Sequence, residues 1–401
     1  MKVLNEDVTE GVLAVLKSQR LFRYDCQQPL ESPTAELEQA FADRIGCRYV
    51  VAMNSCSSAL MTSLLSCGLR PGDGVLMPAF TFIAVPSAIV NAGGVPVLVE
   101  VTDDYVIDCD DLESKITNQT RFLLLSHMRG RVSNMDRIVK LCDRHGVILI
   151  EDCAHSLGVL WNGTQSGKSG RAAAFSAQSY KLIDAGEGGL LVTDDREVAC
   201  RAMLYSGCYE DNWQKHYHDE EDAALLRTLV NGIPAFNLRM GNLSAAALLP
   251  QLQHIDARVA RYNENYRHLT SLLRESAFIE LPEFLPSVRP AADSVQFRIL
   301  LGPAAITRFG ELMAQKGIKI SLLGLSEHNA RCFWRWRFFD HNESCPNPRQ
   351  LLMRTADMRL PLQLSDDNIR HLGVSIMETL REAAAVDASR IPEPVQSGSF
   401  Q

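Results

Sequence analysis

Short apolar runs alternate with segments of helical periodicity from residue 47 to residue 195. Runs that are apolar throughout predict strands at 49–53, 74–78, 95–101, 121–128 and 147–152. Between them, apolar residues recur at helical spacing in 57–69, 82–93, 110–116 and 134–146. Strands without polar alternation, separated by single helices, are typical of a mostly parallel sheet that is covered on both faces. We therefore expect an α/β fold built on such a sheet, with flanking helices.

A different pattern follows residue 241. A long helical pattern at 242–276 is interrupted by Pro250, and a proline-rich segment at 281–294 comes after it. The rest of the chain alternates strand and helix patterns at 295–302, 306–317, 318–323 and 365–385. Because 401 residues exceed the usual single-domain length, we expect a large domain over 1–250, with an N-terminal arm, and a small α+β domain over 251–390. Residues 391–401 are expected to be a disordered tail.

Charge and cysteine usage narrow the functional classes. The chain has 40 basic and 48 acidic residues, a net charge of −8, which argues against a nucleic-acid-binding protein. Its eleven cysteines form no CxxC pair, so they predict reduced thiols and no cysteine metal site. No apolar run approaches the roughly 20 residues that span a bilayer, and the first ten residues lack the order of a secretory signal. We expect a cytoplasmic protein that does not bind membranes.

Polar and small residues follow the predicted strands, and ligands of parallel sheets bind beyond the carboxyl ends of the strands. One such segment, 175–189 (FSAQSYKLIDAGEGG), holds a single lysine, Lys181, before a Gly-Glu-Gly-Gly turn. A lysine that acts as a nucleophile has to lose its proton in a confined site. Pyridoxal phosphate (PLP) demands such a lysine, together with a carboxylate at its ring nitrogen, a phosphate cradle and a side chain stacked on its ring.

The sequence offers a candidate for each of the other three requirements. Asp152 ends a predicted strand 29 residues before Lys181, and a carboxylate there would keep the pyridine nitrogen protonated. The segment 54–60 (NSCSSAL) follows a strand and opens a helix, so its N–H groups and hydroxyls suit a phosphate. Phe82 follows another strand and is the candidate for stacking on the ring.

Taken singly, these residues have ordinary structural explanations, such as a helix cap, a core aromatic residue or a solvated lysine. Cys153 and His155 could suggest a metal site or a Cys/His pair, but no third ligand is near them in the sequence, and we expect no metal. The order and spacing of the four candidates together favour a PLP enzyme.

These segments also resemble the motifs of the PLP-dependent sugar aminotransferases of the DegT/StrS type, a family within the fold type I (aspartate aminotransferase) superfamily. Cys56 and Ser57 stand where the family's phosphate motif has Gly and Thr. The resemblance extends over most of the chain, from residue 35 to residue 382. The matching segments are 55–60 (S-G-T-x-A-L), 151–155 (E-D-x-A-H), 176–181 (S-x-x-x-x-K), 186–189 (G-E-G-G) and 236–240 (Y-N-x-R-M).

The resemblance implies a homodimer with shared active sites. Lys181 would hold PLP as an imine, and Asp152 would pair with the ring nitrogen, which makes these two the catalytic residues. Some relatives carry histidine in place of this lysine and eliminate a hydroxyl, so Lys181 favours an aminotransferase. Asn237 would reach the phosphate of the partner subunit. The implied cofactor-binding residues are Cys56, Ser57, Phe82, Asp152, His155, Ser176, Lys181 and Asn237.

Two basic segments bear on the substrate. Arg129 and Arg131 follow a predicted strand, and a guanidinium there could bind a carboxylate, although a solvated arginine is an equal alternative. The segment 331–341 (RCFWRWRFFDH) alternates aromatic and basic residues. It is expected either to pack on the partner subunit or to form an acceptor-binding wall with Trp334, Arg335 and Arg337.

Extra cationic groups suit an acidic acceptor. The segments 126–130 and 178–189 are similar to those of transaminases that aminate the 8-oxo form of 3-deoxy-manno-octulosonate for lipopolysaccharide. We expect an amino group to pass from L-glutamate to that sugar acid. The alternatives are a nucleotide-linked keto-sugar or a keto-cyclitol as acceptor with glutamine as donor and, in another class, a PLP-binding regulatory protein without turnover.

Overall fold

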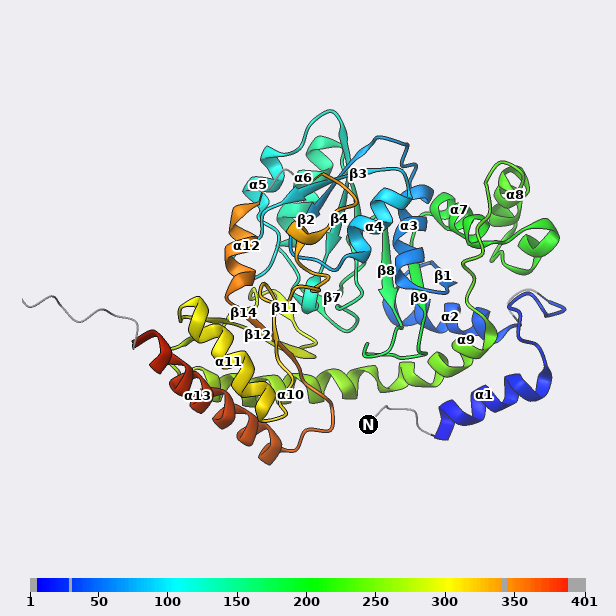
Figure 1. Ribbon diagram of the computed structural model, residues 1–401. Coiled ribbons are helices and arrows are strands. Elements are labelled where there is room, and N and C mark those ends of the chain that lie inside the picture. The colour runs from blue at the N-terminus through cyan, green and yellow to red at the C-terminus, as the bar shows by residue number, and fades with distance from the viewer. Residues whose placement is uncertain (1–5, 29–30, 341–344, 389–401) are drawn as a thin grey trace, which may run out of the picture.

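The computed structural model describes residues 6–28, 31–340 and 345–388. Among these residues, a central sheet of seven strands has the order β1-β9-β8-β5-β4-β2-β3 (Figure 1). Neighbouring strands are parallel except at β9, which is antiparallel to β1 and β8. The mostly parallel α/β sheet expected from the sequence is confirmed. Its strands are β1 (Tyr49–Met53), β2 (Gly74–Pro78), β3 (Val95–Val99), β4 (Thr120–Ser126), β5 (Ile148–Asp152), β8 (Ala172–Ser176) and β9 (Gly189–Thr193).

Helices cover both faces of this sheet because its strands are apolar on both sides. In β1, Val51 and Met53 pack in one core cluster with α3, α4 and α7, whereas Val50 and Ala52 pack in another with α2, α6 and α9. Successive side chains of a strand point to opposite faces, so one apolar strand supplies both clusters. The helices of this part are α1 (Glu6–Ser18), α2 (Pro33–Ile45), α3 (Cys56–Ser66), α4 (Ala84–Asn91), α5 (Cys109–Ser114), α6 (Met135–His145), α7 (Arg196–Ser206) and α8 (Glu220–Leu229).

The strands expected between residues 49 and 152 are confirmed as β1 to β5, and the helices between them as α3 to α6. The hydrophobic pattern did not predict β8, β9 or the helices that flank this region. Among the described helices, none is both long and apolar enough to cross a membrane.

A second sheet, of order β10-β12-β14-β13, packs against α10, α11 and α13. The strands expected at 295–302 and 318–323 are confirmed, although the second is only two residues long, and β14 was not predicted. These elements are α10 (Ile255–Leu273), β10 (Ile279–Glu280), β12 (Ser294–Ile299), α11 (Pro303–Gln315), β13 (Ser321–Leu322), β14 (Thr355–Arg359) and α13 (Asp366–Ala388).

The long helical pattern forms α9 (Asn242–Leu248), a 3-10 turn η3 (Leu249–His254) and α10. Pro250 lacks an N–H group, which fits the tighter turn at this point. In Figure 1 this stretch runs along both sheets, and it joins the core of the first to that of the second. The expected domain boundary at residues 250 and 251 lies within η3 and stays a prediction. The expected tail at 391–401 lies outside the described residues.

The remaining described elements are short. A small sheet of order β11-β6-β7 links the segment after α10 to the segment after β5. The bounds of these elements are η1 (Met128–Gly130), β6 (Leu160–Trp161), β7 (Thr164–Gln165), η2 (Glu210–Lys215), β11 (Val288–Arg289), η4 (Phe333–Arg335) and α12 (Pro346–Met353).

Candidate active site

Lys181 lies on the loop between β8 and β9, where backbone hydrogen bonds hold both arms of the loop together. The N–H of Ser179 donates to the carbonyl of Gly186 at 3.0 Å. The preceding residue, Tyr180, has a left-handed backbone with φ of 77°, which is strained for a residue other than glycine. Its carbonyl accepts a hydrogen bond of 2.8 Å from Nη1 of Arg359, at the end of β14. An arginine of the second sheet therefore holds the strained turn that presents the lysine.

The amine of Lys181 is 3.0 Å from Nε2 of His155. Burial, followed by the positive charge of Arg359, lowers the pKa of Lys181 to about 8. About a tenth of this amine is therefore neutral at pH 7, far more than for an ordinary lysine, and only the neutral form acts as a nucleophile or a general base.

His155 is a neutral imidazole in this arrangement. Burial holds its pKa well below the usual value, and the nearby charges of Lys181 and Arg129 add to that effect. With Nε2 facing Lys181, the other ring nitrogen, Nδ1, is buried and has no hydrogen-bond partner among the described residues. A buried ring nitrogen without a partner is costly, so this atom favours a bound polar ligand beside it.

Asp152 ends β5 and is almost fully buried. Its Oδ2 accepts a hydrogen bond of 2.7 Å from the hydroxyl of Ser126, and its Oδ1 accepts one of 3.0 Å from the N–H of Ala154. Ser126 lies opposite Asp152 in the neighbouring strand β4, so the parallel pairing itself supplies this contact. The carboxylate is thus fixed at the carboxyl edge of the sheet, where ligands of such sheets bind.

Three segments meet at the start of α3. Ser55 caps this helix, and its hydroxyl accepts a hydrogen bond of 3.1 Å from the N–H of Ser58. Gly189, the first residue of β9, packs so closely that a Cβ atom there would lie 2.3 Å from the carbonyl of Ser55. Ser176, the last residue of β8, pairs with Gly189. A helix N-terminus and hydroxyls therefore share one place, which suits a phosphate.

Cys56 and Ser57 form the first turn of α3, and Ser57 is exposed. Burial and the neighbouring Asp152 raise the pKa of the Cys56 thiol well above its usual value, so it stays an uncharged side chain. Phe82 is 43% exposed and lies on the loop between β2 and α4, which leaves its ring available to a ligand. Asn237 is exposed on the segment whose Leu238 carbonyl accepts from the N–H of Asn54 at 2.7 Å.

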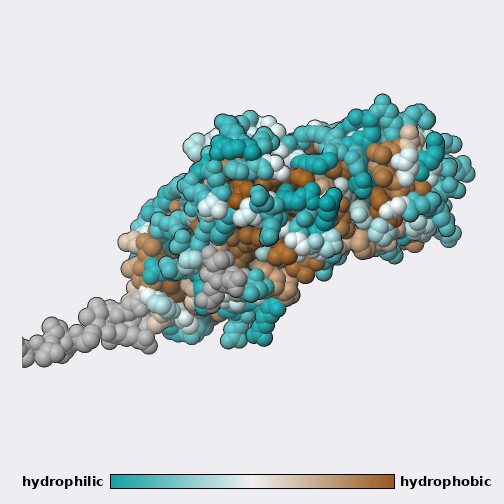
Figure 2. Space-filling model, turned by 90° about the horizontal axis from the view of Figure 1, so that it is seen from above, coloured by the Kyte–Doolittle hydropathy of each residue, from teal (hydrophilic) through white to brown (hydrophobic). Residues whose placement is uncertain are grey.

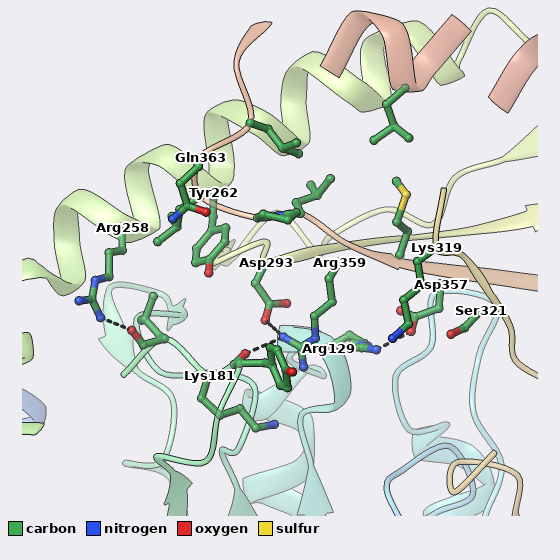
Figure 3. A pocket seen from close by; sticks show the side chains of 18 of the residues that line it. Arg129, Lys181, Arg258, Tyr262, Asp293, Lys319, Ser321, Asp357, Arg359 and Gln363 are labelled. Atoms are coloured by element: carbon green, nitrogen blue, oxygen red, sulfur yellow. Dashed lines mark hydrogen bonds and ion pairs between the residues drawn. The ribbon is translucent and has the colours of Figure 1, made fainter. Parts of the chain in front are cut away.

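A cavity of about 850 Å³ opens beside Lys181 between the two sheets (Figure 3). Arg129 and Arg359 lie in its wall, paired with Asp357 and Asp293 respectively. Asp357 and Arg359 are two residues apart on β14, so both side chains point to the same face of that strand. Among the described residues, its basic lining residues outnumber the acidic ones, Arg129, Lys181, Arg258, Lys319, Arg331 and Arg359 against Asp184, Asp293 and Asp357.

Arg131 corrects one expectation from the sequence. It is 2% exposed, and its guanidinium donates to the carbonyls of Glu283 and Pro282 and lies 4.5 Å from the ring centroid of Phe284. It does not line the cavity. Residues 129 and 131 therefore differ in role, because η1 directs only the first of them into the cavity.

The aromatic and basic segment at 331–341 also differs from expectation. Phe333 and Trp336 are buried in the core of their own chain. In the described part of the segment, these two aromatic side chains are therefore not available to pack on a partner subunit. Arg335 donates to the carbonyl of Gly324 at 3.0 Å, and neither it nor Trp334 lines the cavity. The cavity residue of this segment is Arg331, which sequence reasoning did not single out.

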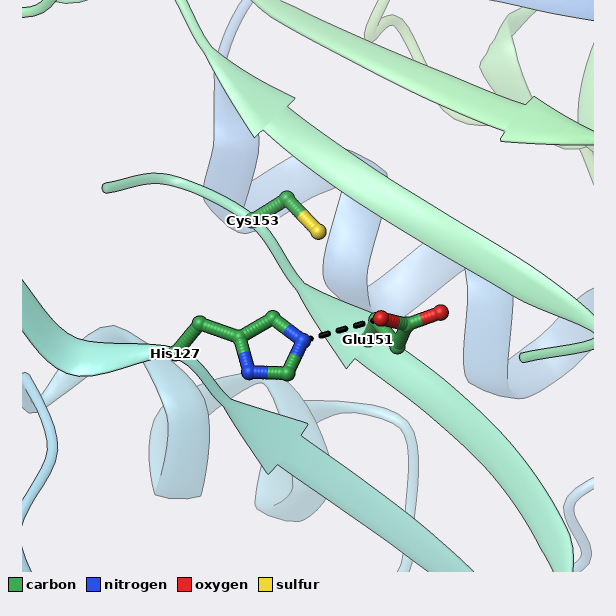
Figure 4. Close-up of side chains that lie close together, drawn as sticks. All are labelled: His127, Glu151 and Cys153. Atoms are coloured by element: carbon green, nitrogen blue, oxygen red, sulfur yellow. Dashed lines mark hydrogen bonds and ion pairs between the residues drawn. The ribbon is translucent and has the colours of Figure 1, made fainter. Parts of the chain in front are cut away.

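His127, Glu151 and Cys153 form a buried group, and the last two are the chain neighbours of Asp152 (Figure 4). The carboxylate of Glu151 is already occupied, since it accepts from Nε2 of His127 at 2.9 Å and from backbone N–H groups of Gly167, Ser169 and Gly170. These donors lower the pKa of Glu151 against the effect of burial. We interpret this group as a support that fastens the ends of β4 and β5 rather than as a metal site.

Replacing Arg359 with glutamine is expected to raise the pKa of Lys181 above its value of about 8, because the positive charge that most opposes protonation is removed. Only the neutral amine reacts with an acylating reagent, so labelling of Lys181 at pH 8 should fall. The measurement is the pH dependence of labelling in the cofactor-free protein, read on the Lys181 peptide by mass spectrometry. The exposed Arg354→Gln is the control, and an unchanged or lowered midpoint in Arg359→Gln would contradict the prediction.

Comparisons with known proteins agree with this geometry. A model of the DegT/DnrJ/EryC1/StrS aminotransferase family matches residues 4–377. A GDP-perosamine synthase from Caulobacter vibrioides is 34% identical over 226 residues, or 56% of this chain and 57% of the relative. An L-glutamine:scyllo-inosose aminotransferase from Streptomyces griseus is 34% identical over 260 residues, or 62% of this chain and 58% of the relative. The matched part of the chain thus spans less than two thirds of the length of either relative.

The fold is also that of solved aminotransferases. The crystal structure of S. venezuelae DesV in complex with a ketimine intermediate superimposes with a TM-score of 0.79 at 25% identity. The match covers 93% of this chain and 94% of that one.

Proposed function

Because the chain belongs to the DegT/DnrJ/EryC1/StrS aminotransferase family, we propose that it is a PLP-dependent enzyme that aminates a keto-sugar acid. The proposed acceptor is the 8-oxo form of 3-deoxy-manno-octulosonate, and the proposed donor is L-glutamate. One observation carries this choice: a cavity with more basic than acidic lining residues, in a chain of net charge −8, lies directly beside an amine of depressed pKa.

The residues present fit PLP. The unpartnered Nδ1 of His155 calls for a ligand at this place, and the close packing of Gly189 on Ser55 fixes the start of α3 beside Ser176. Lys181 would bind the aldehyde, and Asp152 would pair with the ring nitrogen. The phosphate would lie at the start of α3 with Ser57 and Ser176, the ring against Phe82 and His155. When bound, PLP supplies a carrier for the amino group and a ring that accepts electrons.

The chain's own residues supply the proton transfers. When its amine is not bound to the cofactor, Lys181 takes the proton from the α-carbon of the amino donor. Its lowered pKa leaves a fraction of the amine neutral and therefore able to act as a base. The same atom returns a proton to the carbon of the acceptor that receives the amino group. The neutral imidazole of His155 holds Nζ of Lys181 in place through Nε2, and it adds no positive charge beside the amine. The hydroxyl of Ser126 fixes the carboxylate of Asp152 in one orientation.

Anion recognition separates the proposed acceptor from a keto-cyclitol, but not from a nucleotide-linked sugar. A keto-cyclitol has no charge to match the basic lining, whereas a sugar acid has a carboxylate and a nucleotide-linked sugar has phosphates. The two relatives named above act, by their names, on a GDP-linked sugar and on scyllo-inosose, which keeps both alternatives in any test.

We further propose a cytoplasmic homodimer. All eleven cysteines are free, which agrees with a reducing compartment. Helix α1 packs on α9 and leaves Leu13 and Leu16 about half exposed, followed by the exposed Leu21 and Phe22. Figure 2 shows that apolar residues also gather in places on the surface of the molecule, bordered by hydrophilic residues. Asn237, exposed beside the cradle, is suited to meet the phosphate of a partner's cofactor.

The test is a panel of acceptors assayed with the PLP-loaded protein and L-glutamate, with the aminated product measured by mass spectrometry. We expect kcat/KM for the 8-oxo sugar acid to exceed that for its methyl ester by roughly tenfold or more, since charge-assisted hydrogen bonds contribute about 1.5–3 kcal/mol. Preference for a nucleotide-linked sugar or a cyclitol would contradict the acceptor. A protein whose absorbance does not change with any amino donor would instead be the regulatory PLP-binding class.

A further inference from the structure

Two guanidinium groups of the cavity lack the partners that buried cations normally have. Arg129 is 4% exposed, and only its Nη2 is paired, with Oδ2 of Asp357. Its Nε and Nη1 are buried without a hydrogen-bond partner among the described residues. Buried polar atoms are almost always satisfied, and an unpaired charged donor is the costliest exception. The two free donors of Arg129 therefore favour acceptor atoms from outside the described chain.

Arg331 presents a second such group to the same cavity. Its Nε is also buried without a partner in the described part of the chain. Burial, followed by the positive charge of Arg129, lowers the pKa of Arg331 to about 10 against the opposing effect of Asp357. Two like charges held close together in a buried place repel each other, and an anion between them would relieve that repulsion.

The backbone holds Arg331 in place on both sides. The carbonyl of Ala330 accepts from the N–H of Ile83 at 2.9 Å, and Cys332 forms a β-bridge with Phe80. The N–H of Arg331 itself donates to Oδ1 of Asn329 at 3.0 Å. The backbone of Arg331 is therefore fixed beside the loop that carries Phe82, so a ligand has to order only the side chain when it binds.

We propose that Arg129 and Arg331 form the subsite that binds the carboxylate of the acceptor sugar. Arg129 offers unpaired donors at Nε and Nη1 and Arg331 offers one at Nε, and the oxygens of a carboxylate accept hydrogen bonds from such charged donors. This subsite rests on the proposed function for the identity of the sugar, but its anion chemistry stands on the unpaired atoms alone. Arg331, which no sequence motif marked, is then a residue that determines acceptor specificity.

The closing experiment measures binding rather than turnover. Isothermal titration calorimetry on the PLP-loaded full chain would compare 3-deoxy-manno-octulosonate, its methyl ester and inorganic phosphate. Arg331→Gln should weaken binding of the sugar acid about 10- to 100-fold and leave the affinity for the ester unchanged, because only the acid carries the negative charge that pairs with Arg331. Arg331→Lys should recover part of the loss. Arg335→Gln is the matched control, since Arg335 lies in the same segment with its guanidinium on a backbone carbonyl outside the cavity, and it should bind as wild type.

Each other outcome has a defined meaning. Equal affinity of Arg331→Gln and wild type for the sugar acid, with unchanged melting temperatures, would overturn the subsite. Equal losses for acid and ester would also overturn it, because the residue would then act through shape. Phosphate that competes more strongly than the sugar acid would assign the site to a phosphorylated ligand and overturn the carboxylate. A selective loss of acid binding, in an enzyme that aminates no keto-sugar acid, would support the subsite and reject the proposed acceptor.

Discussion

Replacing Lys181 with alanine is expected to reduce transamination by at least about 10³-fold, because the variant loses both the amine that binds the cofactor and the base that moves the proton. The lysine is also the group whose pKa the cavity lowers to about 8. The measurement is kcat with glutamate and the preferred acceptor at saturating PLP. The remaining activity should no longer rise as the pH passes through about 8, since the side chain that titrates is gone, so the loss should be larger above pH 8 than below it.

Lys168→Ala is the matched control for this variant. Lys168 is partly exposed, pairs with Asp194 and does not line the cavity, so it should be replaceable with little effect. After borohydride reduction, a cofactor label on the Lys181 peptide of wild type should be absent from Lys181→Ala. Turnover that survives in Lys181→Ala, or a label on another lysine in wild type, would remove the basis of the proposed mechanism.

Replacing Gly189 with alanine is expected to lower cofactor affinity by about 100-fold and to reduce the free energy of unfolding by about 1–3 kcal/mol or more, the usual range for overpacking. The new Cβ would lie 2.3 Å from backbone atoms of Ser55, so β9 and the start of α3 would have to separate. Separation moves Ser55 and the first turn of α3 away from Ser176, which opens the cradle. The measurements are equilibrium dialysis of PLP and thermal unfolding of the cofactor-free protein.

Gly232→Ala provides the comparison for Gly189→Ala. A Cβ at Gly232 would meet its nearest atom, the carbonyl oxygen of Leu229, at an ordinary 3.5 Å. Its affinity for PLP should therefore equal that of wild type. If Gly189→Ala bound PLP as tightly as Gly232→Ala does, the cradle would not lie between β8, β9 and α3.

The sequence could predict most of the large sheet because burial on both faces leaves an unmistakable apolar run in β1 to β5. It could not predict β14, whose five residues include Asp357 and Arg359. These charged side chains face the cavity, so the strand lacks the continuous apolar run by which a buried strand is recognised in a sequence. For β8 the cause is different: alanine supplies three of its five residues and is weak as a strand signal.

The candidate site divides in the same way. Lys181 and Asp152 could be predicted because each lies in a local motif with a fixed spacing. Arg331 and Arg359 belong to segments that only tertiary packing brings close to Lys181. No motif or fixed spacing in the sequence predicts that they lie there. Arg129 and Arg131 look alike in the sequence, but the left-handed backbone of Arg129, with φ of 58°, sends the two side chains to different places.

One hydrogen bond and one β-bridge join residues 330–332 to residues 80–83. Of the two arginines in the proposed subsite, Arg331 therefore lies on a segment outside the large sheet, whereas Lys181 lies on a loop between two strands of that sheet. Exchanging the segment around Arg331 is then expected to change the acceptor while the lysine stays in place. Chimeras cut on either side of this segment would be the way to engineer such a change.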